Sequence, residues 1–292
     1  MCDEFTALAE EAALDRRGLD RRRFAALSVV GMALTGCTGT AVQASGGGDI
    51  GEKMVSITTA DGVCDAFFVH PAKGVHPGVV MWPDIAGLRD VYKIMARSLA
   101  AEGYAVLVVN QYYRSSPAPI MQSFSEFRTP EGQEKVAPMR ELLDPAAIAR
   151  DARAFVVFLD QRDEVDKARG IGSNGYCMGG PFTVRAAAAV PARVKAAASF
   201  HGAGMVTGEP DSPDRLLGKT QASFLFAIAR NDDARQPEQK TMLRKAADAA
   251  GRPAEIEVYP ADHGWCVADS PAYVSNAADK AWKRMLALYE TL

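Results

Sequence analysis

The chain has 292 residues, of which 48% are hydrophobic and 8% aromatic, and it carries a formal net charge of −3. That length and hydrophobic content suffice for one large buried core. The net charge leaves no basic excess to neutralise phosphates, which argues against a nucleic-acid-binding protein. Beyond the N-terminal region, no hydrophobic run reaches the roughly 20 residues of a membrane-spanning helix.

The first 50 residues resemble a bacterial export signal with a tether behind it. Arginines at 16–17 and 21–23 precede a hydrophobic run over residues 24–34 and then small residues, which is the order of an export signal. The stretch Asp20-Arg21-Arg22-Arg23-Phe24 resembles the twin-arginine motif, which directs folded proteins across a bacterial membrane. The run Ser45-Gly46-Gly47-Gly48 is typical of a flexible tether. We therefore expect the folded domain at 51–292.

Two processing sites compete within this signal. Leu34-Thr35-Gly36-Cys37 resembles a lipobox, after which Cys37 would be the lipidated first residue of a membrane-anchored protein. Val42-Gln43-Ala44 resembles an ordinary signal-peptidase site, after which a soluble periplasmic protein would be released. The alternative to both is a basic arm on a cytoplasmic protein that is not exported. A lipid at Cys37 is the one membrane contact that we expect.

Strands and helices alternate along the rest of the chain. Residues 56–59 and 63–69, on either side of Asp61-Gly62, are typical of a hairpin. A strand over 79–82 precedes a helix that ends at Gly103, and residues 105–109 are hydrophobic on both faces, as in a buried parallel strand. The hydrophobic stripe of that helix consists of Leu88, Val91, Ile94, Met95 and Leu99.

A long loop over residues 111–143 follows, and we expect it to form a lid or pocket wall. Asp144-Pro145 then starts a helix with a cap residue and a first-turn proline. The expected buried face of that helix consists of Ile148, Phe155, Phe158 and Leu159. The remaining elements are a strand at Ile171, a helix over 182–190, strands over 194–200 and 224–228, a helix over 238–250 ending at Gly251, a strand over 256–259, and a last helix that starts at Ser270-Pro271 and packs through Trp282, Met285, Leu286 and Tyr289. This alternation predicts an α/β fold with one doubly wound, mostly parallel sheet and helices on both faces.

The stretch Gly175-Tyr176-Cys177-Met178-Gly179-Gly180 has the glycine spacing of a nucleophile elbow, with cysteine at the centre. A strand that turns abruptly into a helix strains the central residue, and bulky neighbours would clash. The helix N-terminus that follows favours a thiolate. The alternative is a structural cysteine buried in a glycine-rich turn.

The histidines restrict the choice of a catalytic base. Of the four histidines, His263 alone follows both the elbow and a later strand that ends in acidic residues. The acid is expected after the strand that ends near residue 228, where Asp232 is the candidate and Asp233 is expected as an exposed turn residue or helix cap. The order of nucleophile, acid and histidine is that of α/β-hydrolases. The alternatives are a loop histidine with local hydrogen bonds and two solvated aspartates.

The cysteine pattern indicates neither a disulfide framework nor a metal site. Cys64, Cys177 and Cys266 remain once the N-terminal region is set aside, and no Cys-x-x-Cys pair is present. Cys64 and Cys266 could pair in an oxidising compartment, although two buried free thiols are the expected state.

The motif around Cys177, Ser199-Phe200-His201-Gly202 and Asp262-His263-Gly264 together resemble the dienelactone hydrolase family of α/β-hydrolases, from about residue 54 to the C-terminus. The resemblance implies a Cys177, Asp232 and His263 triad that attacks a lactone or ester carbonyl. It also implies an oxyanion hole at the backbone N–H groups of Ile85 and Met178.

Four further residues are candidates for roles around this site, three of them through the resemblance and His201 through its place at a strand end. Asp84 stands where the family has an acidic residue, usually glutamate, that contacts and tunes the cysteine; a helix N-cap is the alternative. Tyr112-Tyr113-Arg114 resembles the stretch that supplies an arginine for a substrate carboxylate, so Tyr113 and Arg114 are candidate substrate-binding residues, with a surface arginine as the alternative. His201 is expected to line the pocket or to hydrogen-bond a catalytic residue.

The leading hypothesis is a cysteine-dependent hydrolase of small carboxylic esters or lactones that works through a thioester acyl-enzyme. We expect a monomer that needs no cofactor or metal. The alternative from another class is an exported protein that binds a ligand or senses thiol oxidation without turnover. A serine-type esterase is a weaker possibility, because the elbow lacks serine.

Overall fold

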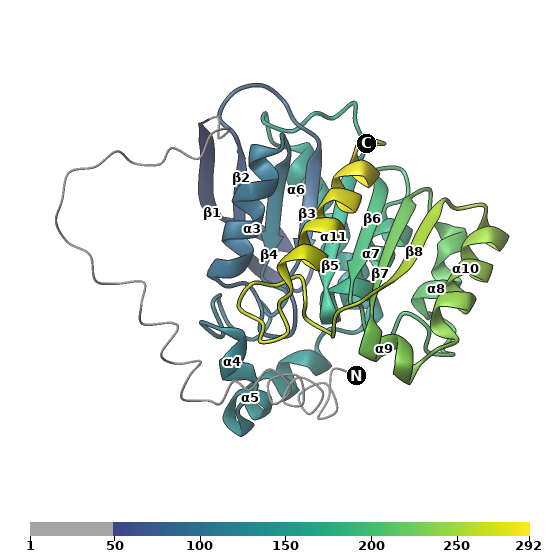
Figure 1. Ribbon diagram of the computed structural model, residues 1–292. Coiled ribbons are helices and arrows are strands. Elements are labelled where there is room, and N and C mark those ends of the chain that lie inside the picture. Colours follow the sequence, from purple (N-terminus) through teal and green to yellow (C-terminus); the bar gives the residue numbers. More distant parts are fainter. Residues whose placement is uncertain (1–48) are drawn as a thin grey trace, which may run out of the picture.

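The computed structural model describes residues 49–292 (Figure 1). The expected export signal, the twin-arginine motif, both processing sites and the glycine-rich tether lie outside the described residues and stay predictions. The first strand begins at Ile50, one residue before the expected domain boundary. Within residues 49–292, no helix combines the length and the hydrophobicity that crossing a bilayer requires.

The described residues form one eight-stranded sheet in the order β1-β2-β4-β3-β5-β6-β7-β8. The two pairings of β2 are antiparallel and all pairings from β4 through β8 are parallel. This confirms the doubly wound, mostly parallel sheet. The strands are β1 (Ile50–Thr59), β2 (Gly62–Pro71), β3 (Gly78–Trp82), β4 (Ala105–Val109), β5 (Ile171–Tyr176), β6 (Val194–Phe200), β7 (Ser223–Ala229) and β8 (Ala254–Tyr259).

Helices cover both faces of the sheet (Figure 1). One core cluster packs α3 and α11 against the sheet, and a second packs α6, α7 and α10 against the opposite face. The helices α4 and α5 lie below the carboxyl ends of the strands in Figure 1, and α9 lies at the lower right near the end of β7. The helices are α3 (Asp90–Ala101), α4 (Phe124–Phe127), α5 (Pro130–Glu141), α6 (Pro145–Asp160), the 3₁₀ turn η1 (Cys177–Gly179), α7 (Gly180–Ala189), α8 (Pro213–Leu216), η2 (Leu217–Lys219), α9 (Arg230–Arg235), α10 (Gln239–Ala250) and α11 (Ser275–Tyr289).

Local signals set several of these boundaries. Asp144 caps α6, because its side chain accepts a hydrogen bond from Ala147 N at 2.7 Å. Gly251 ends α10 with a left-handed φ of 63°, a conformation that glycine adopts without steric cost. All five residues of β4 are buried, as expected for a strand covered on both faces.

Three expectations about the elements are wrong. On α3 the buried face is formed by Tyr92, Ala96 and Leu99, so Ile94 points outward and is 58% exposed. The last helix begins at Ser275 rather than Ser270, because the Ser270 carbonyl accepts the N–H of Tyr273 at 3.1 Å and so begins a separate turn. The segment over 111–143 is not an irregular loop, since it contains α4 and α5.

Candidate active site

Cys177 lies where β5 ends and η1 begins, at the carboxyl edge of the sheet. Its φ of 53° is left-handed, and the residue is 3% exposed. The flanking glycines are required by close approach of backbone: a Cβ at Gly175 would lie 2.0 Å from Gly179 O, and one at Gly179 would lie 2.5 Å from Trp82 O. These are the strained turn and tight packing of a nucleophile elbow.

Asp232 and His263 come together at the same edge of the sheet. Asp232 follows β7, His263 follows β8, and Asp232 Oδ2 lies 2.7 Å from His263 Nδ1. The Asn231 side chain accepts the backbone N–H of His263 at 2.8 Å, which fixes the loop. Asp233, expected as an exposed turn residue or helix cap, lies instead inside α9 and forms an ion pair with Lys240.

The Asp232 carboxylate is held in its ionised form. Burial acts to raise its pKa, but the neighbouring His263 and the hydrogen bond between them outweigh burial, so the pKa lies below its ordinary value. A carboxylate in this position orients the imidazole and stabilises its protonated form.

His201 connects the elbow with His263. The backbone N–H of Cys177 donates to His201 Nδ1 at 3.1 Å. The ring centroids of His201 and His263 are 4.6 Å apart, and the Trp265 ring lies at 5.2 Å from His201 on another side. Cys177 and His263 are thus both neighbours of one buried imidazole, in agreement with the expectation that His201 lies at the site.

The two residues expected to form the oxyanion hole lie in the same hydrophobic cluster as Cys177. Ile85 is 1% exposed, and its carbonyl accepts the Tyr112 hydroxyl at 2.8 Å, which holds the loop after β3. Met178 lies at the start of η1, where backbone N–H groups have no partner inside the helix.

The segment over 111–143 supplies much of this cluster. Its members from that segment are Tyr112, Ile120, Met121, Phe124, Phe127 and Val136. This segment therefore packs against the elbow, and its role as a lid or pocket wall stays a prediction.

The carboxylate of Asp84 is bound by a buried arginine, and its expected influence on the thiol stays a prediction. Its two oxygens accept the Nη1 and Nη2 atoms of Arg89 at 2.7 and 2.9 Å, and Oδ1 also accepts Ala86 N. Both members of this pair are almost fully buried. The alternative role as a helix cap is wrong, because α3 starts at Asp90 with Arg89 as its cap residue.

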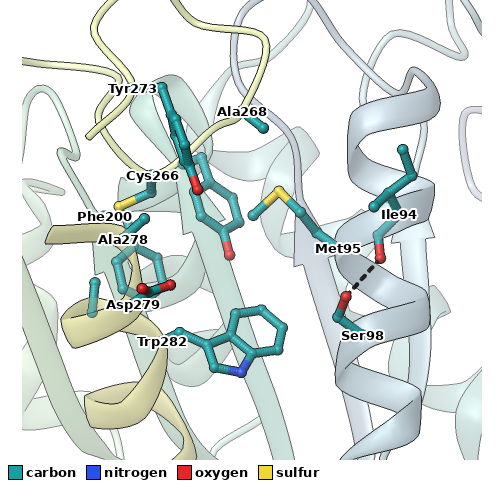
Figure 2. Close-up of a pocket in the computed structure, with 12 residues that line it drawn as sticks. Ile94, Met95, Ser98, Phe200, Cys266, Ala268, Tyr273, Ala278, Asp279 and Trp282 are labelled. Atoms are coloured by element: carbon teal, nitrogen blue, oxygen red, sulfur yellow. Dashed lines mark hydrogen bonds between the residues drawn. The ribbon is translucent and has the colours of Figure 1, made fainter. Parts of the chain in front are cut away.

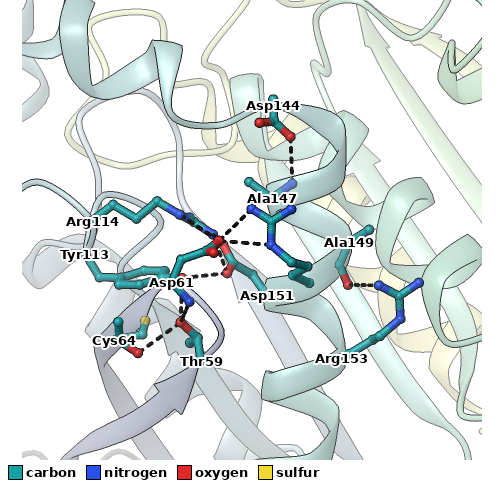
Figure 3. Close-up of polar contacts among 12 residues, drawn as sticks. Thr59, Asp61, Cys64, Tyr113, Arg114, Asp144, Ala147, Ala149, Asp151 and Arg153 are labelled. Carbon is teal, nitrogen blue, oxygen red and sulfur yellow. Dashed lines mark hydrogen bonds and ion pairs between the residues drawn. The ribbon is translucent and has the colours of Figure 1, made fainter.

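Arg114 and Tyr113 contact protein carboxylates rather than an open pocket (Figure 3). Arg114 donates to both oxygens of Asp151 at 2.7 and 2.8 Å and to Asp61 at 2.6 Å. The Tyr113 hydroxyl donates to Asp151 and lies 2.7 Å from the Thr59 hydroxyl. Because two carboxylates already take up the guanidinium, the expected contact with a substrate carboxylate is corrected to a structural ion-pair cluster.

A cavity of about 290 Å³ lies on the other side of the elbow, between α3 and α11 (Figure 2). Tyr176 and Phe200 form part of its lining, and they directly precede Cys177 and His201 in the chain. Asp279 contributes the one charged side chain of this lining. None of the three triad candidates borders this space among the described residues, so it is separate from the site at the elbow.

The described cysteines form no disulfide. Cys64 and Cys266 do not pair with each other, which confirms the expected thiol state of these two residues. Cys64 is fully buried and Cys266 partly so. Residues 49–292 contain no cluster of three or more His, Cys, Asp or Glu side chains placed to hold a metal ion.

Comparison with known proteins identifies the family. The sequence model of the dienelactone hydrolase family matches residues 64–292. The chain belongs to this family. A Synechocystis protein, provisionally named a carboxymethylenebutenolidase, is 29% identical over 249 residues, which cover 83% of this chain and 98% of that relative.

Solved structures of dienelactone hydrolase type share the fold. A Klebsiella pneumoniae protein, provisionally named a dienelactone hydrolase, superposes with a TM-score of 0.71 at 24% identity and covers 84% of this chain and 100% of its own. A dienelactone hydrolase-like promiscuous phosphotriesterase from metagenomic libraries gives 0.68 at 22% identity, with coverages of 83% and 98%. At these identities the likeness is one of fold.

Sequence reasoning missed Arg89 and Asp269. Arg89 is 1% exposed, and besides Asp84 it donates to both oxygens of Asp269 at 2.7 and 2.8 Å. Asp269 Oδ2 also accepts Phe124 N at 3.1 Å. The only available signal was an arginine within the hydrophobic stretch that leads into α3, which does not reveal a partner 180 residues away.

Proposed function

We propose that the protein hydrolyses carboxylic esters or lactones of small molecules through a thioester acyl-enzyme formed on Cys177. The observation that carries the proposal is the position of His201, whose imidazole contacts the Cys177 backbone at 3.1 Å and lies 4.6 Å from the ring of His263. Cys177 and the pair of His263 and Asp232 are therefore both neighbours of one buried imidazole, which supports the proposed roles of nucleophile, base and acid. Membership of the dienelactone hydrolase family supports the reaction class.

Acylation begins with attack of the Cys177 thiolate on the carbonyl carbon. His263 takes up the thiol proton, and Asp232 stabilises the resulting imidazolium through its bond to Nδ1. The negative charge that develops on the carbonyl oxygen is stabilised by the N–H groups of Ile85 and Met178. Collapse of this intermediate breaks the C–O bond, and His263 returns the proton to the departing alkoxide.

Deacylation uses the same groups on water. Neutral His263 removes a proton from a water molecule, and the hydroxide attacks the thioester carbonyl. The C–S bond then breaks, the carboxylic acid is released and the thiol is restored. When the substrate is a lactone, the alcohol and the acid stay in one product molecule.

A comparison of two cysteine variants of the full-length chain tests this function. We expect Cys177→Ala to abolish hydrolysis of p-nitrophenyl butyrate and of dienelactones, because only the nucleophile is removed. Cys266→Ala serves as the matched control, since Cys266 borders the separate cavity between α3 and α11, and it should keep wild-type turnover. Acid quenching during turnover should trap an acyl group on the peptide that contains Cys177, as seen by mass spectrometry.

The outcomes separate the hypotheses. Undiminished turnover in Cys177→Ala would overturn the mechanism. A wild-type protein that binds esters without turning over any of a broad ester and lactone panel would instead favour a non-catalytic ligand-binding protein.

A further inference from the structure

His201 combines three features that a histidine which merely fills space would not need. It is 1% exposed, it has a left-handed φ of 40°, and its Nδ1 accepts a hydrogen bond from the nucleophile's own backbone. Cys177, at the other end of that hydrogen bond, is also left-handed. In residues 49–292 these two are the only residues other than glycine with a positive φ.

Strand pairing in the sheet places Cys177 and His201 at corresponding positions beyond the ends of β5 and β6. Tyr176 of β5 pairs with Phe200 of β6, so Cys177 and His201 each come one residue beyond the last paired position. At that point the Cys177 N–H turns away from the strand ladder and requires an acceptor, because a buried N–H without one is costly. The imidazole supplies it.

The hydrogen bond defines the protonation of His201. Because Nδ1 accepts, the ring proton is carried on Nε2, and the imidazole is neutral. Burial, together with the neighbouring His263, holds the pKa of His201 well below its ordinary value, which agrees with this state. Contacts with Trp265 and His263 fix the plane of the ring.

We propose that His201 is a positioning residue for the nucleophile: its Nδ1 holds the Cys177 N–H and thereby keeps Cys177 in the left-handed conformation that presents the thiol to the carbonyl. This proposal rests on the function of Cys177 proposed above. His201 acts through Cys177 and takes up no proton during turnover. A displacement of the nucleophile by about 1 Å is enough to lower the rate substantially.

Three substitutions in the full-length chain test the two ring nitrogens separately. In His201→Asn the side-chain oxygen occupies roughly the position of Nδ1, and asparagine tolerates a left-handed φ. In His201→Gln the amide is one carbon longer and corresponds to Nε2, so it is the matched control. In His201→Leu neither polar atom is present.

We expect kcat for p-nitrophenyl butyrate to fall about 10- to 100-fold in His201→Leu and His201→Gln, with KM nearly unchanged. His201→Asn should stay within about fivefold of wild type. The rate of Cys177 alkylation by iodoacetamide should follow the same order across pH 6–9, which a general loss of stability would not produce. The thermal unfolding midpoint of each variant identifies any that does not fold, and the comparison of Asn with Gln remains decisive if Leu is lost.

Equal kcat and alkylation rates in the Asn and Gln variants would overturn this role of His201. That result leaves the proposed function intact provided that turnover still depends on Cys177. Turnover that persists in Cys177→Ala overturns the proposed function itself.

Discussion

At the scale of single residues, the site depends on two backbone conformations that residues with side chains rarely adopt. Cys177 and His201 both have positive φ, and each such residue costs free energy that the surrounding structure must offset. The tight backbone contacts of Gly175 and Gly179 hold the first of them, and the Cys177–His201 hydrogen bond couples it to the second. The strain is therefore concentrated where the chemistry is proposed to occur.

Acid should destabilise the protein through His201. The pKa of His201 is lowered in the folded state and is about 6.5 in the unfolded chain, so below about pH 6.5 the unfolded chain binds a proton that the folded one does not. The free energy of unfolding should then fall as pH falls, by up to about 1.4 kcal/mol per pH unit from this group. In His201→Asn this contribution is absent.

Urea unfolding of wild type and His201→Asn between pH 5 and 8 measures that difference. The two curves should run parallel above pH 7 and diverge below pH 6.5, with wild type falling more steeply. Parallel curves over the whole range would mean that His201 is protonated equally in the folded and unfolded states.

The sequence allowed some of these residues to be predicted and not others. Cys177, Asp232 and His263 follow strand ends in a fixed order. That order can be recognised in the sequence even when the distances between the side chains are unknown. Arg114 was placed by resemblance, but its contacts with Asp61 and Asp151 depend on how the hairpin meets α6. Ion pairs between residues distant in the chain leave no periodic pattern in the sequence from which they could be predicted.

At the scale of elements, Arg89 joins three segments around the site. It binds Asp84 in the loop after β3 and Asp269 in the loop after β8, and Asp269 in turn accepts the N–H of Phe124 at the start of α4. These segments carry Ile85, His263 and the expected pocket wall. One guanidinium thus binds the loop of the proposed oxyanion hole and the loop of the proposed base, and it contacts the expected wall through Asp269.

Arg89→Lys should weaken both folding and catalysis. A lysine ammonium offers three donors on one point charge and cannot form two bidentate carboxylate contacts. Since Asp84 is 2% exposed, we expect the free energy of unfolding to drop by about 2–4 kcal/mol and kcat to fall about tenfold. Chemical denaturation and ester hydrolysis measure the two effects.

Arg97→Lys is the control for that substitution. Arg97 forms an ion pair with Glu52 in which both side chains are more than a third exposed, so its replacement should cost less than about 1 kcal/mol and leave kcat unchanged. Equal effects of the two substitutions would show that the bridge through Arg89 has no special role.

Element boundaries were predictable where a local signal sets them. Asp144 and Gly251 mark helix ends through their own hydrogen bonds or φ, and β4 is recognisable because both of its faces are hydrophobic. The start of α11 was predicted five residues too early, because Ser270-Pro271 is equally suited to a turn. The helix α4 was missed because it has only four residues, and α5 was missed because its sequence is mostly polar and has Pro138 inside the helix.

At the scale of the whole molecule, an ion-pair cluster connects the antiparallel edge of the sheet with α6 (Figure 3). Asp61 lies in the turn between β1 and β2, Arg114 follows β4, and Asp151 belongs to α6. Asp151 is 1% exposed and accepts hydrogen bonds from both Arg114 and Tyr113. The cluster therefore connects three parts of the chain that are distant in sequence.

Asp151→Asn should lower stability without altering catalysis. Loss of the buried charge leaves Arg114 with one exposed partner, and we expect the midpoint of thermal unfolding to fall by about 5–10 °C. KM and kcat should remain within about twofold of wild type for both a neutral ester and a carboxylate-bearing ester. A selective rise in KM for the carboxylate-bearing ester, with an unchanged midpoint, would restore Arg114 as a substrate ligand.

The three cysteines of residues 49–292 are expected to differ in their reactivity toward alkylating reagents. Burial raises the pKa of Cys64 and of Cys266 far above the ordinary thiol value, so both stay protonated at neutral pH and react slowly. If Cys177 is the nucleophile, a mild alkylating probe will mark it ahead of the other two. The molar amount of label would then count competent active sites directly, and a preparation could be titrated before its substrate is known.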